Sequence, residues 1–152
     1  MVDDNPDPYN LQRFVDAQNP IYDDVVTELQ DGLKRTHWIW FIFPQLRILA
    51  RSTMATHYGI TSIPEARAYL QHPVLGPRLH ECTQLVNQIE DRSAEEIFGP
   101  IDDVKLQASM TLFAHASITN YTDGVPENQD FLNLLDKYYA GQQDPASIGA
   151  QL

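Results

Sequence analysis

The sequence is short of cysteine, of basic residues and of long apolar runs. One cysteine among 152 residues excludes an intrachain disulfide framework and a cysteine-rich zinc site. Lysine and arginine total 10 against 21 aspartates and glutamates, which gives a net charge of −11. So acidic a surface repels nucleic acids and anionic membranes unless its charges are segregated. The longest strongly apolar run covers residues 38–43, whereas a helix needs about 20 residues to span a bilayer.

Established catalytic motifs are also missing. The sequence has no Gly-x-Ser-x-Gly elbow, no Walker loop, no Gly-x-Gly-x-x-Gly and no His-Glu-x-x-His. No two of the five histidines stand three or four residues apart, so we expect no metal site and no cofactor. The first ten residues contain no basic residue, which is atypical of a secretory signal. Together with the single cysteine, this predicts a cytoplasmic protein.

What remains is a globular composition with a helical pattern. Hydrophobic residues make up 43% of the chain, and apolar side chains recur three and four residues apart, as on amphipathic helices. Clean alternation with a period of two is missing. We therefore predict one compact all-α domain, residues 1–152 with an ordered core over about 8–141. It should contain six to eight short helices, a central helix starting near Asp102 and a loop at 118–127.

Helix ends are clearly marked in the sequence. Ser93 and Glu96 are spaced as in a capping box, in which each side chain bonds to the other residue's backbone N–H. Three Asx-Pro pairs are typical of a capping side chain followed by proline in the first turn: Asp7-Pro8, Asn19-Pro20 and Asp144-Pro145. Three glycines stand where a helix could end in a left-handed residue: Gly32, Gly99 and Gly141. The apolar run 38–43 should form a buried helix that ends or kinks before Pro44.

Charge is unevenly distributed along the chain. Residues 34–80 carry a net charge of +5, whereas 1–33 carry −7 and 81–152 carry −9. One interpretation is internal ion pairing between this basic segment and its acidic flanks. The other is that some of its side chains converge on a small anionic ligand, such as a phosphate or carboxylate. Nucleic acid and membrane are not expected partners, and a protein partner stays undefined.

The junction between basic residues and the apolar run is the most unusual part of the sequence. Charged groups at the edge of an apolar wall are typical of small-ligand sites. In the predicted site, Trp40 would stack on the ligand, His37 would act as acid or base, and the other side chains would hold the anion. The predicted ligand-binding residues are Lys34, Arg35, Trp40, Gln45, Arg78 and Lys105. If the protein is an enzyme, hydrolysis of a glycosidic or phosphoester bond is the expected class; the alternative is a non-catalytic protein-interaction module.

Two further residues have structural and chemical interpretations. Ser109 stands four residues after Lys105, hence on the same helix face, and a Lys–Ser pair can activate a serine. We favour an ion pair or a ligand contact for Lys105. Cys82 falls on an apolar stripe with Leu79 and Val86, which predicts a core residue.

Three separated motifs resemble a known family. They are His-Trp-x-Trp-Phe-x-Phe-Pro-Gln at 37–45, the run 66–79 with His-Pro-Val-Leu-Gly-Pro-Arg-Leu, and Ile-Phe-Gly at 97–99 with Lys-Leu-x-x-Ser-Met-Thr-Leu-Phe at 105–113. In this order they are similar to the domain of unknown function 1810 family. The resemblance implies a mainly helical domain and no established activity. Some members carry the label calpastatin, but the Thr-Ile-Pro-Pro-x-Tyr-Arg element of calpastatin is absent, so the label is not transferred.

Overall fold

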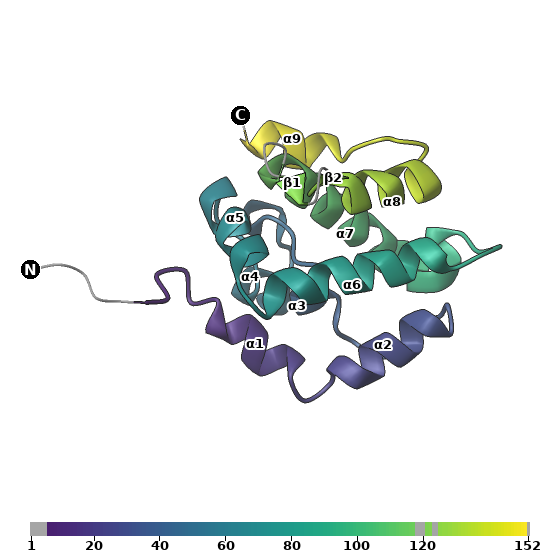
Figure 1. The fold of residues 1–152 in the computed structure, drawn as a ribbon, viewed down its shortest axis with the longest axis horizontal. Coiled ribbons are helices and arrows are strands. Elements are labelled where there is room, and N and C mark those ends of the chain that lie inside the picture. The colour runs from purple at the N-terminus through teal and green to yellow at the C-terminus, as the bar shows by residue number, and fades with distance from the viewer. Residues whose placement is uncertain (1–5, 118–120, 123–124, 152) are drawn as a thin grey trace, which may run out of the picture.

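Helices make up nearly all of the regular structure in a computed structural model, which describes residues 6–117, 121–122 and 125–151 (Figure 1). In chain order the elements are α1 (Gln12–Gln18), α2 (Tyr22–Gln30), α3 (Ile39–Ile42), the 3-10 turn η1 (Arg47–Leu49), α4 (Thr53–His57), α5 (Ile63–Gln71), α6 (Leu75–Gln88), α7 (Ala94–Ala116), β1 (Tyr121–Thr122), β2 (Val125–Pro126), α8 (Gln129–Tyr139) and α9 (Pro145–Gln151). The predicted all-α fold is confirmed. The segment 118–127 contains the antiparallel pair β1–β2, in which Tyr121 faces Pro126; its residues 118–120 and 123–124 lie outside the described part.

The second half of α7 forms the centre of the fold. Its side chains from Leu106 to Ala116 are buried, apart from the half-buried Gln107 and His115. Helices α5, α8 and α9 pack against it, and α6 packs against α5 and α8. Figure 1 shows α1 and α2 on one side of the molecule and α8 and α9 on the other. A helix that is apolar nearly all round must be buried, and the predicted central helix is confirmed.

The start of α7 follows one sequence signal and departs from another. The Ser93–Glu96 capping box is present, with both reciprocal hydrogen bonds. Gly99 has a φ of 86°, which kinks the helix before Pro100. The helix continues directly after Gly99, so Asp102 lies inside it. The prediction that Asp102 caps a helix is therefore wrong. Proline needs no N–H partner in a first turn, which explains why the helix restarts there.

The Asx-Pro pairs predict a helix cap correctly at one of three sites. Asp144 Oδ2 accepts the backbone N–H of the residue three positions on, at 2.9 Å, and α9 begins at Pro145. The Asn19 prediction is wrong, because α2 begins at Tyr22 with no side-chain cap. At the N-terminal pair the cap is displaced: Asp7 Oδ2 accepts the N–H of Gln12, where α1 begins, at 2.9 Å. Gly32 and Gly141 have the positive φ that was predicted.

The aromatic run forms the short helix α3 immediately before Pro44, as predicted. Trp38 precedes α3 and is fully buried, with its ring edge-on to Phe98. Its indole Nε1 donates a hydrogen bond to Glu28 Oε1 at 3.1 Å. The buried indole needs this acceptor, because a buried N–H without a hydrogen bond would cost about 1–3 kcal/mol of stability.

Glu28 is a buried carboxylate that collects four donors. Oε1 accepts the backbone N–H groups of Arg35 at 2.5 Å and Thr36 at 2.9 Å in addition to Trp38. Oε2 accepts the Thr36 hydroxyl at 2.7 Å. Burial raises the pKa of Glu28, but these hydrogen bonds outweigh it and leave the pKa below its ordinary value. The carboxylate therefore fixes the segment between α2 and α3.

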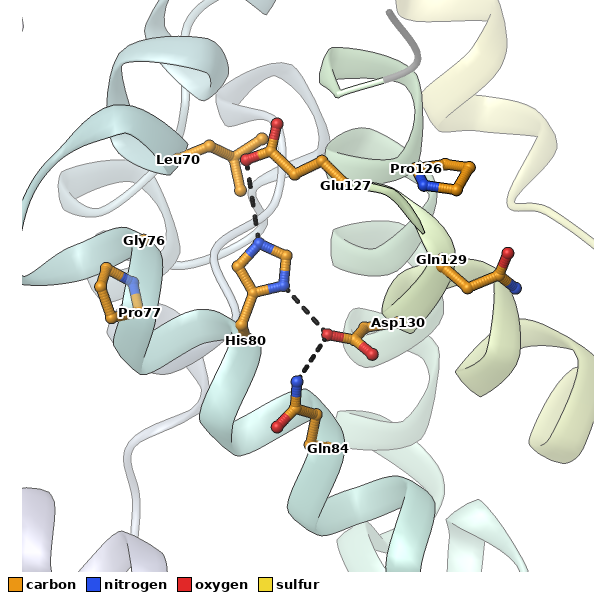
Figure 2. A pocket seen from close by; sticks show the side chains of 9 residues that line it. All are labelled: Leu70, Gly76, Pro77, His80, Gln84, Pro126, Glu127, Gln129 and Asp130. Carbon is orange, nitrogen blue, oxygen red and sulfur yellow. Dashed lines mark hydrogen bonds and ion pairs between the residues drawn. The ribbon is translucent and has the colours of Figure 1, made fainter. Parts of the chain in front are cut away.

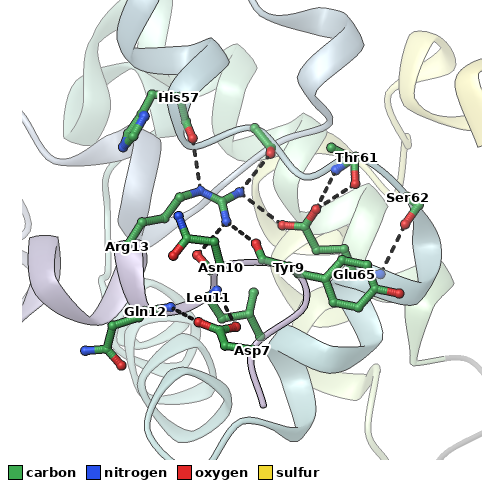
Figure 3. Close-up of polar contacts among 11 residues, drawn as sticks. Asp7, Tyr9, Asn10, Leu11, Gln12, Arg13, His57, Thr61, Ser62 and Glu65 are labelled. Atoms are coloured by element: carbon green, nitrogen blue, oxygen red, sulfur yellow. Dashed lines mark hydrogen bonds and ion pairs between the residues drawn. The ribbon is translucent and has the colours of Figure 1, made fainter. Parts of the chain in front are cut away.

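Arg13 fastens α1 to the turn between α4 and α5 (Figure 3). Its guanidinium uses all five of its N–H donors. The acceptors are His57 O at 3.0 Å, Tyr9 O at 2.6 Å, Asn10 O at 2.7 Å, Gly59 O at 3.1 Å and Glu65 Oε2 at 3.0 Å. Glu65 is buried, and its other oxygen accepts the backbone N–H and the hydroxyl of Thr61. This network is complete, so Arg13 has no donor left for a ligand.

Cys82 is confirmed as a core residue. Its side chain is buried on α6, and burial raises the pKa of its thiol to about 12.

Within the described ranges, none of the helices combines the length and apolar character needed to cross a bilayer.

Candidate functional site

The segment 45–52 is held in place by its pairing with residues 59–60. The N–H of Ile60 donates to Gln45 O at 2.9 Å, and the N–H of Arg47 donates to Ile60 O at 2.8 Å. Gly59 permits this approach, because a Cβ there would lie 2.5 Å from Arg47 Cα. The pairing holds the segment that contains η1, which packs against α4 and α9.

A groove of about 440 Å³ runs between this segment, α7 and the start of α9. Its volume is within the usual range for small-molecule sites, roughly 300–1,000 Å³. Most of the wall is apolar, and the apolar residues are Leu49, Ala55, Ile101, Val104, Ala108 and Ala146. The polar residues of the wall are Gln45, Arg51, Ser52, Lys105 and Asp144.

Lys105 connects the groove with the aromatic run. Its Nζ lies 3.6 Å from Asp102 Oδ1 and 5.7 Å from the centroid of the Trp40 ring. Of the two interpretations favoured for Lys105, an ion pair or a ligand contact, the structure shows the ion pair. Ser109 is fully buried, and neither its Oγ nor Trp40 Nε1 has a hydrogen-bond partner among the described residues. A buried hydroxyl with no base bonded to it is a poor nucleophile, which argues against a Lys–Ser mechanism.

The seven residues of the predicted site do not gather in one place. Gln45 and Lys105 line the groove, and Trp40 touches Lys105. His37 is exposed and makes no hydrogen bond or ion pair to the described residues. The remaining three are engaged by other side chains: Lys34 by Asp102 at 2.9 Å, Arg35 by Asp31 at 2.9 Å, and Arg78 by Asn19 Oδ1 at 2.9 Å and the Tyr22 ring at 4.6 Å.

Two arginines are the exception to this internal pairing. Among the lysines and arginines, all ten of which lie in described ranges, only Arg47 and Arg51 have no side-chain hydrogen bond, ion pair or ring contact to the described residues. Both are exposed, and they line one shallow hollow with Ala50, Ser52, Thr53, Thr56 and His57. Arg51 and Ser52 also line the groove. No sequence motif distinguishes Arg47 and Arg51, which are marked only by their place in the basic segment.

A second hollow, of about 420 Å³, is built around His80 (Figure 2). The ring lies between two carboxylates, with Nδ1 3.1 Å from Asp130 Oδ2 and Nε2 3.8 Å from Glu127 Oε1. Gln84 donates to the same Asp130 oxygen at 2.9 Å, and the ring stacks on Phe131 at 5.0 Å. Sequence reasoning missed this histidine because its partners lie about fifty residues away.

The His80 arrangement orients an imidazole between two carboxylates. To activate a hydroxyl, thiol or amine nucleophile, the imidazole would need that group within hydrogen-bond reach. The nine residues that line this hollow include no serine, threonine, cysteine or lysine. Its contacts join α6 to the start of α8, so we interpret His80 as a structural connection.

Comparison with known proteins places the chain in a family. The sequence profile of "Protein of unknown function (DUF1810)" matches residues 8–150. The chain belongs to the DUF1810 family. The resemblance carried by the three sequence motifs is thus confirmed.

This DUF1810 chain is similar to a solved structure, a conserved hypothetical protein, Rv1873, from Mycobacterium tuberculosis. The two are 59% identical with a TM-score of 0.87, over 95% of this chain and 98% of the other. No curated protein matches the chain. The comparisons therefore establish family and fold, and the functional argument rests on the groove and its charges.

Proposed function

We propose that this DUF1810 protein binds a small anionic ligand at the hollow lined by Arg47 and Arg51. The observation that carries the proposal is that these two guanidinium groups have no hydrogen-bond, ion-pair or ring partner in the described structure, whereas every other lysine and arginine side chain has at least one. Unpaired arginines sharing one hollow stand out in a protein with a net charge of −11.

The chemistry of the hollow suits a phosphate or a carboxylate. Arginine presents paired N–H groups that match two oxygens of such an anion. Hydroxyls of Thr53 and Thr56 and the ring of His57 are further polar groups in the same lining, which contains no acidic residue. The negative charge of the rest of the molecule disfavours a long polyanion but leaves a small anion acceptable.

The proposed site is centred on Arg47 and Arg51, and only some of the residues expected from the sequence lie near it. Gln45 and Lys105 belong to the adjoining groove, with Trp40 behind Lys105. Lys34, Arg35 and Arg78 are satisfied elsewhere, and His37 is remote from any partner that would orient it. Binding is therefore proposed without a reaction.

The test is an NMR titration of the folded protein with inorganic phosphate. Wild-type protein should show saturable shifts of backbone amides within residues 47–57. The double variant Arg47→Gln and Arg51→Gln should lose affinity by at least ten-fold, since hydrogen bonds to charged groups contribute about 1.5–3 kcal/mol each. Arg35→Gln with Arg92→Gln is the matched control, because it removes the same charge from two other exposed arginines. Equal loss in both variants, or no saturable shift in wild-type protein, would refute the proposal.

A second candidate function, a protein-interaction module, is favoured by exposed apolar side chains. Ile48, Ile101 and Val104 are 75%, 71% and 57% exposed, and the last two line the groove. Apolar side chains grouped at a polar rim are typical of interaction surfaces. Selection from a random peptide library should then enrich peptides that combine apolar and acidic residues, and Val104→Ser should abolish their binding. Failure to enrich such peptides would argue against this candidate.

A further inference from the structure

We infer that the ligand is amphiphilic, with one anionic group at Arg51 and an apolar body of about eight carbons in the groove. This inference rests on the proposed function and names the class of its ligand. It follows from the connection between the basic hollow and the apolar groove, from the charges inside the groove, and from its size.

The hollow and the groove share residues at their junction. Arg51 and Ser52 line both. An anion held by Arg51 therefore lies at one end of the groove, and whatever is attached to it can extend along Leu49, Val104 and Ala108. A free inorganic anion would leave this apolar wall in water.

The charges along the groove leave room for one anionic group. Lys105 Nζ lies 3.6 Å from Asp102 Oδ1, but this carboxylate also pairs with Lys34 at the shorter distance of 2.9 Å. Asp144 uses Oδ2 to accept the backbone N–H of Ser147 at 2.9 Å and its hydroxyl at 2.5 Å. The lining therefore carries two positive charges, Arg51 and Lys105, against the negative charge of Asp144, and its net charge of +1 matches a monoanion such as a carboxylate.

The volume limits the length of the apolar body. About 440 Å³ corresponds to roughly fifteen groups the size of a water molecule, at about 30 Å³ each. A chain of about eight carbons with its head group fits this space. Burial of one methylene is expected to tighten binding about four-fold when complete, and somewhat less in a groove open on one side.

The experiment is a calorimetric or NMR titration with a series of probes at concentrations below micelle formation. The anions are inorganic phosphate, acetate, butanoate, hexanoate and octanoate, and octylammonium is the probe of opposite charge. Affinity should rise two- to four-fold with each added methylene from butanoate to octanoate. Octylammonium should bind at least ten-fold more weakly than octanoate.

Two variants separate the apolar wall from the anion site. The double variant Ile101→Ser and Val104→Ser should weaken octanoate at least ten-fold and leave phosphate unchanged, because both side chains are mostly exposed and carry no charge. Leu33→Ser is the matched control, an apolar residue 38% exposed and outside the groove lining. Arg51→Gln should weaken both phosphate and octanoate.

The possible failures can be told apart. If phosphate binds in an Arg51-dependent way but affinity does not change with chain length, the amphiphilic ligand is refuted and the anion site stands. If octylammonium binds as tightly as octanoate, the groove does not select an anion and the inference is also refuted. If none of the anions binds, the inference and the proposed function both fail.

Discussion

Replacing Glu28 by alanine should be among the most destabilising single changes in this protein. The substitution removes the acceptor of four hydrogen bonds, from Arg35 N, Thr36 N, Thr36 Oγ1 and Trp38 Nε1. Water can replace the acceptor for the exposed Arg35 and Thr36 but not for the fully buried Trp38 indole. With about 1–3 kcal/mol for a buried donor left unpaired, and a smaller loss at the others, we expect a total of about 3–5 kcal/mol.

Thermal and urea denaturation measure this loss. For a domain of this size, 1 kcal/mol shifts the melting temperature by about 2–4 °C, so the expected decrease is roughly 10 °C. Glu28→Gln keeps one acceptor oxygen and should lose less. Glu90→Ala is the control, because that carboxylate is 81% exposed and its contact with Lys137 spans 3.8 Å. Similar melting temperatures for the Glu28→Ala and Glu90→Ala proteins would refute the argument.

The same carboxylate should contribute to acid sensitivity. The pKa of Glu28 is lowered in the folded protein, because its hydrogen bonds outweigh the effect of burial. A lowered folded-state pKa contributes stability that is present above the ordinary glutamate pKa of about 4.3 and is lost as the pH falls through the folded-state value. Urea midpoints measured from pH 6 to pH 2 should therefore fall more steeply in wild-type protein than in Glu28→Gln. Parallel curves would show that Glu28 does not titrate in this way.

Three further predictions concern stability. Arg13→Lys supplies three donors for five acceptors, so it should lower the free energy of unfolding, measured by urea denaturation, by about 2–4 kcal/mol. Arg35→Lys is the control and should cost less than 1 kcal/mol, because its ion pair is exposed. Equal losses would refute the role of Arg13. Burial is the main cause that raises the pKa of Asp103 in the folded protein. Stability therefore falls as the pH rises through this folded-state pKa. Asp103→Asn should raise the melting temperature at pH 7 but not at pH 3. Gly99→Ala should cost about 1–3 kcal/mol from backbone conformation alone, because φ of 86° with ψ of 166° is a combination that few residues other than glycine adopt, and no atom lies within 4 Å of the added Cβ. A loss above 4 kcal/mol would point to a clash.

The fold could be predicted because its signals are local. Helical periodicity, the Ser93 capping box and the proline after the aromatic run depend on residues within a few positions of one another. The Asn19 signal failed because the turn between α1 and α2 is set by a backbone hydrogen bond, in which the Ile21 N–H donates to Gln18 O at 3.0 Å. Such a turn competes with a side-chain cap and leaves little trace in the sequence.

The candidate site was much less predictable, since it depends on which charges find partners. Gln45 and Lys105 were expected in one site and do line one groove, but the other charged residues expected there are engaged elsewhere. Arg35 and Arg51 look alike in the sequence, yet Arg35 has an aspartate four residues before it and Arg51 does not. Aspartates pair with Lys34 and Arg35, and neutral groups hold Arg67 and Arg78. Within the described residues, this leaves Arg47 and Arg51 without a partner at one hollow.

The burial of Cys82 gives this protein a built-in chemical reporter. Alkylating reagents attack the thiolate, and a thiol that is buried and has a pKa of about 12 offers almost none at neutral pH. Native protein should therefore stay unlabelled until α6 separates from its neighbours, so the labelling rate measures how often the core opens. For the same reason, a cysteine introduced at the exposed Ile48 would take up a fluorophore or spin label selectively, beside the groove whose ligand is sought.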